Sequence, residues 1–280
     1  MRIVDTQCHV STVWYEPAET LLAQMDRSGV DRAVLIQMLG ELDNSYQQAC
    51  VARFPDRFAS VVAVEASVPV ACTILSGLAA DGAAGVRLRP DARSPGDDPL
   101  AIWRCAADLG LPVSCVGTAE KFGAPAFFDL IAALPALTIV LEHLGGTSQS
   151  SATELDARKR VFALAEFPNV YLKLPGLGEL IARPGPSKVA ALDKTPGLRE
   201  ETGQGRSAPA VFATPIPEIE LALESFGPDR LMWGSDFPVV CGREGYANAL
   251  GWARHAVASA MPDAEARVFG GTARRVFRLN

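Results

Sequence analysis

Histidine and paired cysteines are scarce in this chain of 280 residues, which contains three histidines and six cysteines. No two cysteines stand in a C-x-x-C arrangement, so neither a disulfide framework nor a thiolate metal site is indicated. Scattered cysteines in apolar surroundings are typical of buried, reduced thiols. Together with a first segment too short and too polar to be a signal peptide, they predict a cytoplasmic protein.

The chain also lacks a basic cluster and a long apolar run. Its net charge of −6 and its isoelectric point near 5.2 argue against nucleic acid or an anionic membrane as a partner. No apolar run approaches the roughly 18 residues of a membrane-spanning helix. Because 49% of the residues are hydrophobic, a large core can form, and we expect a globular protein whose partner is a small molecule.

A glycine-rich G-x-G-x-x-G turn, the mark of many doubly wound open sheets, does not follow the first apolar run. Eight short runs rich in Val, Ile and Leu recur instead, and amphipathic segments separate most of them. This alternation predicts a single (β/α)8 barrel over residues 1–280. The expected strands are 2–10, 32–38, 58–65, 85–89, 112–116, 137–144, 170–174 and 230–237, and clear helices are expected at 17–27, 44–53, 99–109 and 124–133.

One segment, from about 178 to 217, breaks this alternation with Pro, Gly, Ser and charged residues. A loop of this length is uncommon inside a compact domain and is often functional or disordered. In a barrel it would follow the seventh strand, on the face where barrel enzymes carry their chemistry. A lid and an irregular insertion with some helix are both compatible with this composition.

Polar residues at the carboxyl ends of barrel strands converge on one pocket, which makes these positions the candidate site. Strand alternation predicts that Asp5, Gln7 and His9 share one face of the first strand. His143 and Asp236 come at the ends of the sixth and eighth expected strands. Two of the three histidines therefore fall at strand ends, which favours a catalytic site, whereas His255 lies in a helical stretch and is expected to be peripheral. The remaining strand-end residues are Gln37, Glu65, Arg87, Arg89, Cys115 and Lys173.

Among these residues the cations suit a substrate carboxylate, because a guanidinium matches a carboxylate with two parallel hydrogen bonds. We expect Arg87, Arg89 and Lys173 to bind the substrate, with a structural ion pair as the alternative for Arg87 and a structural role as the alternative for Lys173. Gln37 and Cys115 are expected to line the pocket. Glu65 is the weakest candidate.

Five blocks of sequence carry a resemblance to a known family. They are IVDTQCHV at 3–10, IVLEHLG at 139–145, NVYLKL at 169–174, FGPDRLMWGSDFP at 226–238 and FGGTARRVF at 269–277. In this order they resemble the amidohydrolase superfamily, in the branch of small amidohydrolase-related lactonases and decarboxylases. The resemblance spans the chain and implies a His-x-His pair on the first strand, a His on the sixth and an Asp on the eighth.

His9, His143 and Asp236 match that pattern, whereas Gln7 stands in place of the first histidine and Cys115 near a further family histidine. A glutamine amide is a poor zinc ligand, so we expect metal-independent chemistry. If one divalent ion binds, zinc or manganese, the expected ligands are His9, His143 and Asp236.

The resemblance implies hydrolysis of a small carboxylated lactone. Asp236 would activate water, while His9, His143 and Gln7 would stabilise the oxyanion. Three alternatives stay open: a non-oxidative decarboxylase of an aromatic acid, another acid–base enzyme on the same barrel, and a binding protein that has lost catalysis. A homodimer is one of the open oligomeric states.

Overall fold

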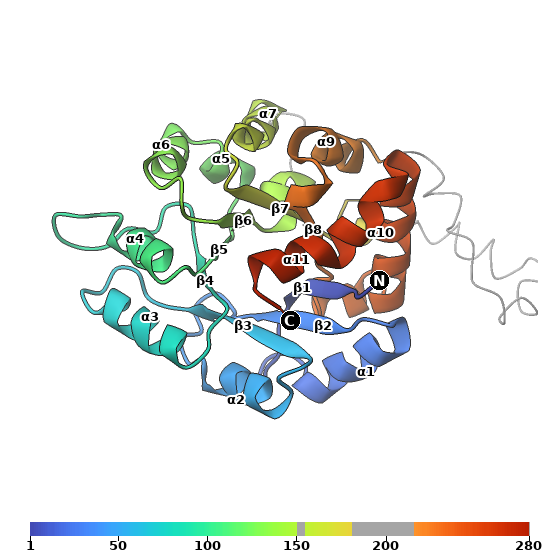
Figure 1. Cartoon of the computed structure of the whole chain (residues 1–280), viewed down its shortest axis with the longest axis horizontal. Helices are drawn as coiled ribbons and strands as arrows, with labels where there is room; N and C mark the ends of the chain where they lie inside the picture. Colours follow the sequence, from blue (N-terminus) through green and yellow to red (C-terminus); the bar gives the residue numbers. More distant parts are fainter. Residues whose placement is uncertain (150–154, 181–215, 280) are drawn as a thin grey trace, which may run out of the picture.

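The computed structural model describes residues 1–149, 155–180 and 216–279, and its eight strands form one parallel sheet (Figure 1). The strands follow one another in chain order, and a bridge between Cys8 and Phe237 links the first strand to the segment that follows the last one. Helices surround this nearly closed sheet, so the predicted (β/α)8 barrel is confirmed. The strands are β1 (Val4–Cys8), β2 (Arg32–Ile36), β3 (Phe58–Ala63), β4 (Gly85–Leu88), β5 (Val113–Cys115), β6 (Ile139–Leu141), β7 (Val170–Leu174) and β8 (Leu231–Trp233).

The helices form the outer ring of the barrel (Figure 1). Each of the four helices expected from the sequence begins and ends within two residues of its predicted limits. Their amphipathic pattern identified them, because one face of each packs on the sheet. The α-helices are α1 (Ala18–Ser28), α2 (Ser45–Arg53), α3 (Ala71–Ala80), α4 (Ala101–Asp108), α5 (Ala119–Phe122), α6 (Pro125–Ala133), α7 (Leu155–Ala163), α9 (Pro217–Phe226), α10 (Tyr246–Ala260) and α11 (Thr272–Val276).

Two apolar clusters hold the barrel together. The larger one lies between strands and helices and includes the fully buried Trp103 and Trp233. The smaller one fills one end of the barrel interior with Val34, Val140 and Met232, and Phe277 packs against it. Burying each such side chain contributes about 1.5–3 kcal/mol. The interior therefore has an apolar floor, and the polar residues of the strands occupy the other end.

Strand β1 contains an irregularity that moves one predicted residue away from the site. Its pairing with β2 shifts register between Asp5 and Cys8, as a β-bulge does. The carboxylate of Asp5 consequently accepts a hydrogen bond from Tyr246 of α10, whereas the amide of Gln7 reaches Lys173 inside the barrel. The expectation that Asp5 shares a face with Gln7 and His9 was therefore wrong, because an extra residue inverts the alternation of side chains.

Strands β6 and β8 are shorter than expected, and the candidate residues lie just beyond them. His143 and Asp236 both adopt left-handed backbone conformations, with φ of 50° and 63°. Such a conformation is unfavourable for residues other than glycine and concentrates at functional sites, where the surrounding structure holds it. The chain turns sharply after each strand and presents both side chains at the carboxyl end of the barrel.

Most of the expected insertion at 178–217 lies outside the described residues, as does any lid it would form. The first residues of this segment are described and belong to the short 3₁₀-helix η4 (Leu177–Glu179). The N–H of Gly178 donates to the carboxylate of Glu244. Within the described parts of the chain, no helix combines the length and the apolar character needed to cross a membrane.

Candidate active site

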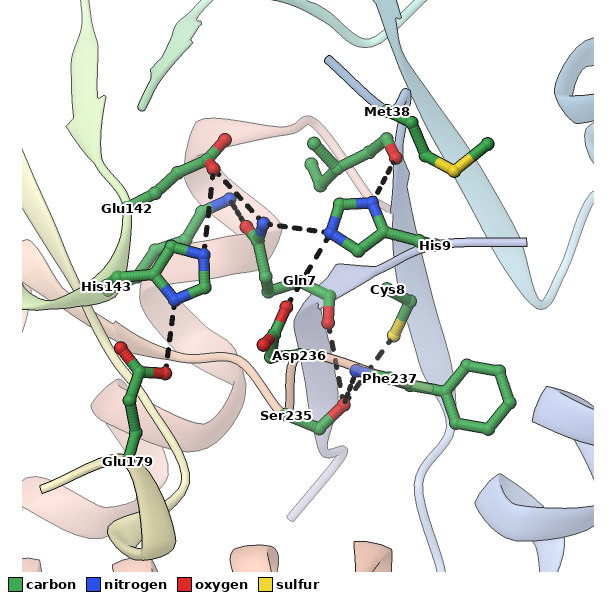
Figure 2. A network of polar contacts seen from close by, with 12 residues as sticks. Gln7, Cys8, His9, Met38, Glu142, His143, Glu179, Ser235, Asp236 and Phe237 are labelled. Carbon is green, nitrogen blue, oxygen red and sulfur yellow. Dashed lines mark hydrogen bonds and ion pairs between the residues drawn. The ribbon is translucent and has the colours of Figure 1, made fainter. Parts of the chain in front are cut away.

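His9, His143 and Asp236 converge at the carboxyl ends of β1, β6 and β8 (Figure 2). Nε2 of His9 lies 3.6 Å from Oδ1 of Asp236. The charge of His143 also acts on the Asp236 carboxylate, which places the two groups in electrostatic reach of one another. The structure thus brings together the three residues that the sequence placed at strand ends.

The backbone of β1 holds Asp236 in place. The backbone N–H of Asp236 donates to the carbonyl of Gln7 at 2.9 Å, and the backbone N–H of His9 donates to the carbonyl of Phe237 at 2.8 Å. Gly234 permits this close approach, because a Cβ at that position would lie 2.6 Å from Cβ of Gln7. A larger residue at 234 would push the two segments apart and displace the carboxylate.

The carboxylate of Asp236 is ionised near neutral pH. Burial alone would raise its pKa, but the hydrogen bond from His9 and the charges of His143, His9 and Arg243 outweigh burial and lower it. Asp236 is largely buried but keeps 9% of its surface exposed. An ionised, accessible carboxylate beside two imidazoles is able to accept a proton from water.

His9 is fixed on both sides of its ring. Nδ1 lies 2.7 Å from the carbonyl oxygen of Ile36, which can only accept a hydrogen bond, so Nδ1 donates to it. Nε2 then faces Asp236 and the side-chain amide of Gln7, the latter at 3.5 Å. Tyr15 stacks on the ring with centroids 5.8 Å apart. The position of the imidazole is therefore set by β2 and by the loop after β1.

His143 is held by Glu179, a residue that sequence reasoning missed. Nδ1 of His143 lies 3.1 Å from Oε2 of Glu179. Burial alone would lower the pKa of His143, but the hydrogen bond and charge of Glu179, with the charges of Asp236 and Glu142, outweigh burial and raise it. The composition of the segment after β7 obscured Glu179, because its proline and glycine content was typical of a loop.

A buried ion pair lies on the other side of Gln7 and contains a second missed residue, Glu142. Its carboxylate accepts from Nε and Nη2 of Arg87 at 3.1 and 2.6 Å, and from Oγ of Ser114 at 2.6 Å. Burial alone would raise the pKa of Glu142, but the charges of Arg87 and Lys173 hold it well below its usual range. Alternation along β6, which turns Val140 and Glu142 the same way, was a sequence signal for this residue.

Lys173 lies inside the barrel and is 1% exposed. Its ammonium donates to Oε1 of Gln7 at 2.6 Å and to Oγ of Ser114 at 2.9 Å. Burial lowers the pKa of Lys173 to about 8, an effect that the charge of Glu142 partly opposes. Lys173 and Arg87 are both engaged with protein groups, and their expected contact with substrate remains a prediction.

The other expected pocket residues are spread over different surroundings. Ser114 points into the interior from β5, so Cys115 lies on the opposite face, where it is fully buried in the larger apolar cluster. The amide of Gln37 donates to the carbonyl of Asp43 and accepts from the N–H of Met38. Strand alternation thus assigns the interior position of β5 to Ser114, which corrects the expectation for Cys115.

A cavity of about 500 Å³ opens beside the buried ion pair, at the ends of β3 and β4. Arg87 is common to the cavity and the ion pair. Arg89 and Glu65 also line the cavity, and both are exposed. The carboxylate of Glu65 accepts hydrogen bonds from Ser67. The cavity therefore has an exposed guanidinium, that of Arg89, and a buried one, that of Arg87, in its lining. His255 is exposed on α10, as expected for a peripheral residue.

One group of side chains has the donor set of a metal site. His143, Glu179 and Asp236 each offer a ligand atom, and these atoms lie within 4.8 Å of one another. An imidazole with two carboxylates suits zinc or manganese, so the residues fit a divalent cation. This set contains Glu179 where the sequence predicted His9. Arg243, whose Nη1 lies 3.5 Å from Glu179 and 4.0 Å from Asp236, already supplies positive charge there.

A (β/α)8 barrel with a carboxylate and two imidazoles at the carboxyl ends of its strands is the architecture of a barrel enzyme. A sequence profile of the amidohydrolase family matches residues 7–279. The chain therefore belongs to the amidohydrolase family, as predicted.

Similar proteins include an L-fucono-1,5-lactonase of Burkholderia ambifaria, 30% identical over an alignment of 271 residues that covers 94% of this chain and 84% of the relative. An amidohydrolase structure from Burkholderia multivorans with bound zinc has a TM-score of 0.74, 18% identity and full coverage of both chains. A structure from Pseudomonas putida assigned as a 2-pyrone-4,6-dicarboxylic acid hydrolase has a TM-score of 0.72 and 19% identity, covering 100% of this chain and 98% of that one. The family and the relatives confirm the predicted hydrolase class.

Proposed function

We propose that this protein hydrolyses a small carboxylated lactone without a metal ion. The observation that carries the proposal is the carboxylate of Asp236, which is ionised, partly accessible and 3.6 Å from the imidazole of His9. The similarity to an L-fucono-1,5-lactonase supports a lactone as substrate class. The family resemblance of the strand-end residues supports the same chemistry.

In the proposed reaction Asp236 accepts a proton from water as the oxygen of that water bonds to the lactone carbonyl carbon. His143 and the side-chain amide of Gln7 donate hydrogen bonds to the oxyanion that develops. The ring C–O bond then breaks, and the proton held by Asp236 passes to the leaving alkoxide. The product is a hydroxy acid, and Asp236 returns to its ionised form.

His143 suits the role of a donor because its surroundings favour the protonated imidazole. The three acids Glu179, Asp236 and Glu142 all raise its pKa against the effect of burial. A cationic donor stabilises a developing oxyanion more strongly than a neutral one. His9 keeps Nε2 directed at Asp236 and orients the carboxylate toward the reacting water.

The substrate carboxylate is assigned to Arg89, with Arg87 and Lys173 contributing positive charge from the barrel interior. Arg89 is exposed and lines the same cavity as Arg87. A guanidinium binds a carboxylate through two parallel hydrogen bonds. Arg87 connects this cavity to the site, because its partner Glu142 directly precedes His143 in the chain.

A divalent ion, if one binds, would be held by His143, Glu179 and Asp236 and would polarise the substrate carbonyl. We favour the metal-independent reaction because Gln7 offers an amide at the position where the family resemblance implies a histidine ligand. Its own oxygen is already bound to the ammonium of Lys173.

The test is a panel of sugar-acid lactones and pyrone carboxylates, with hydrolysis followed by proton release at constant buffer. Ring opening of one or more carboxylated lactones, lost in the Asp236→Asn variant, supports the proposal. Release of carbon dioxide from a hydroxybenzoate, with no lactone opened, would replace it by the decarboxylase alternative. Thermal stabilisation by lactones without turnover would favour a binding protein.

A further inference from the structure

A buried pair of side chains, Asp5 and Tyr246, lies directly behind the segment that carries Asp236. Asp5 is 0% exposed and Tyr246 is 2% exposed. The phenolic O–H of Tyr246 donates to Oδ2 of Asp5 at 2.8 Å. Neither residue lies among the groups assigned above to substrate or water, so their place in the structure calls for a separate explanation.

The other carboxylate oxygen of Asp5 joins the two segments of the site. Oδ1 accepts the backbone N–H of Ser235 at 2.8 Å and the backbone N–H of Gln7 at 3.2 Å. Gln7 is the proposed amide donor, and Ser235 immediately precedes Asp236. One carboxylate oxygen therefore ties the backbone of β1 at Gln7 to the backbone at Ser235, where the turn that carries Asp236 begins.

The turn itself needs this support because Asp236 is left-handed, with a φ of 63°. Ser235 continues the link by accepting the N–H of Phe237 on Oγ at 3.0 Å (Figure 2). A single residue in this conformation costs about 1–3 kcal/mol and persists only where its neighbours hold it. Asp5 supplies two of the fixed points, and Tyr246 fixes Asp5.

A purely structural explanation is weaker for two reasons. A buried carboxylate is costly unless its hydrogen bonds compensate, and a pair of apolar residues would fill the same space at lower cost. The partners of Asp5 are also concentrated at residues 7 and 235, which flank the site, and Tyr246 packs edge-on against Phe237 with ring centroids 6.2 Å apart. Both contacts act on the turn that presents Asp236.

We infer that Asp5 and Tyr246 are positioning residues that hold the carboxylate of Asp236 at the reacting water. The kinetic part of this inference rests on the proposed lactone hydrolysis, whereas its structural part does not. Removal of the Tyr246 hydroxyl leaves Asp5 free to turn, which loosens Ser235 and lets Asp236 leave its left-handed conformation. Substrate contacts are unchanged, so the effect falls on turnover and not on binding.

The experiment compares Tyr246→Phe with Tyr46→Phe as a matched control. The Tyr46 hydroxyl accepts the N–H of Ala18 at 3.1 Å, so both variants lose one hydroxyl and one hydrogen bond. We expect Tyr246→Phe to lower kcat about tenfold, in line with the loss of one buried hydrogen bond that costs about 1 kcal/mol or somewhat more. KM should stay within about twofold, as expected when only transition-state stabilisation is lost.

The pH profile separates positioning from a general loss of stability. When Asp236 moves away from His9, the carboxylate loses a hydrogen bond that lowers its pKa. The pKa of Asp236 then rises, and the acid limb of the kcat profile moves to higher pH. Tyr46→Phe should lower the melting temperature to a similar extent while keeping kcat and the acid limb of the wild type. Asp5→Asn, which retains the shape of the side chain, should shift the limb in the same direction as Tyr246→Phe.

Amide hydrogen exchange provides a readout that needs no substrate. Peptides covering 231–240 should exchange faster in Tyr246→Phe than in the wild type and in Tyr46→Phe. Exchange and kcat that both match the wild type, or a change in only one of them, would overturn the inference. If the wild type opens no lactone, the proposed function fails and the exchange of 231–240 alone decides on the positioning role.

Discussion

The ammonium of Lys173 donates to the side-chain carbonyl of Gln7 across 2.6 Å inside the barrel. An ammonium only donates, and the carboxylate of Glu142, 3.1 Å from Nε2 of Gln7, only accepts. The two groups therefore fix which way the amide of Gln7 points. Its second N–H is directed toward His9, which lies 3.5 Å away. There the amide of Gln7 offers a hydrogen-bond donor where a histidine would offer a metal ligand.

Asp236→Asn removes the proposed base while preserving its shape. We expect kcat/KM to fall by about 10²–10⁴, the usual contribution of a general base. The control is Asp229→Asn, an exposed residue paired with Arg267, which should keep wild-type kinetics. Circular dichroism should show the same fold in both variants. Wild-type turnover by Asp236→Asn would remove Asp236 from the mechanism.

Metal removal tests the preference for a metal-independent reaction. We expect the purified protein to contain well under one equivalent of zinc or manganese by elemental analysis, and chelators to leave kcat unchanged. Glu179→Gln, which removes a candidate ligand atom, should not alter the metal content. Stoichiometric metal that is lost together with activity on chelation would contradict the preference.

The lowered pKa of Lys173 predicts a specific pH dependence of stability. Its folded pKa of about 8 lies below its ordinary value of 10.5, so the unfolded chain binds more protons between these values. The contribution of Lys173 to the unfolding free energy therefore rises from pH 8 to pH 10.5. In denaturant titrations, the unfolding free energy of the wild type should therefore rise relative to that of Lys173→Met between pH 8 and pH 10.5. Lys159→Met, at an exposed residue, should run parallel to the wild type.

Glu142→Gln should destabilise the fold strongly, because it leaves the buried charges of Arg87 and Lys173 without their counter-ion. Breaking a buried pair in this way costs about 3–5 kcal/mol. Glu265→Gln breaks a partly exposed pair with Arg254 and should cost about 1 kcal/mol or less. Urea unfolding measures both free energies, and equal losses in the two variants would show that the buried pair contributes no more to stability than the partly exposed one.

Arg89→Gln tests the assignment of the substrate carboxylate. Losing a charge-assisted hydrogen bond worth about 1.5–3 kcal/mol should raise KM by about tenfold or more with kcat little changed. A lactone without a carboxylate should show no such difference. Arg27→Gln, on the exposed side of α1, serves as the charge-matched control. An unchanged KM for the carboxylated lactone would reassign its binding to another cation.

Much of the barrel was predictable from the sequence because its elements are local. Apolar runs of four to eight residues and amphipathic segments between them have periodicities that a single chain displays. The four expected helices and all eight strands are present, with shorter strands than the apolar runs suggested. Strand-end positions also identified His9, His143 and Asp236, since parallel strands bring their carboxyl ends to one face.

Other parts of the site depended on contacts between distant segments. Glu142 became part of the site through Arg87, 55 residues away in the chain, and the amide of Gln7 is oriented by Lys173, 166 residues away. Glu179 was obscured in a segment whose composition was typical of a loop. The alternation rule misplaced Asp5 because a bulge, set by how β1 pairs with its neighbour, adds a residue that no local pattern in the sequence marks.

The order of apolar and polar residues along the chain thus determined the fold class and the strand ends that carry chemistry. The tertiary structure decided which charges meet, which face Asp5 takes and which groups orient His143 and Gln7. The physical reason is the range of the interactions. Periodicity and backbone preference act between near neighbours, whereas hydrogen bonds and ion pairs inside the barrel join side chains that are far apart in the chain, such as Gln7 and Lys173.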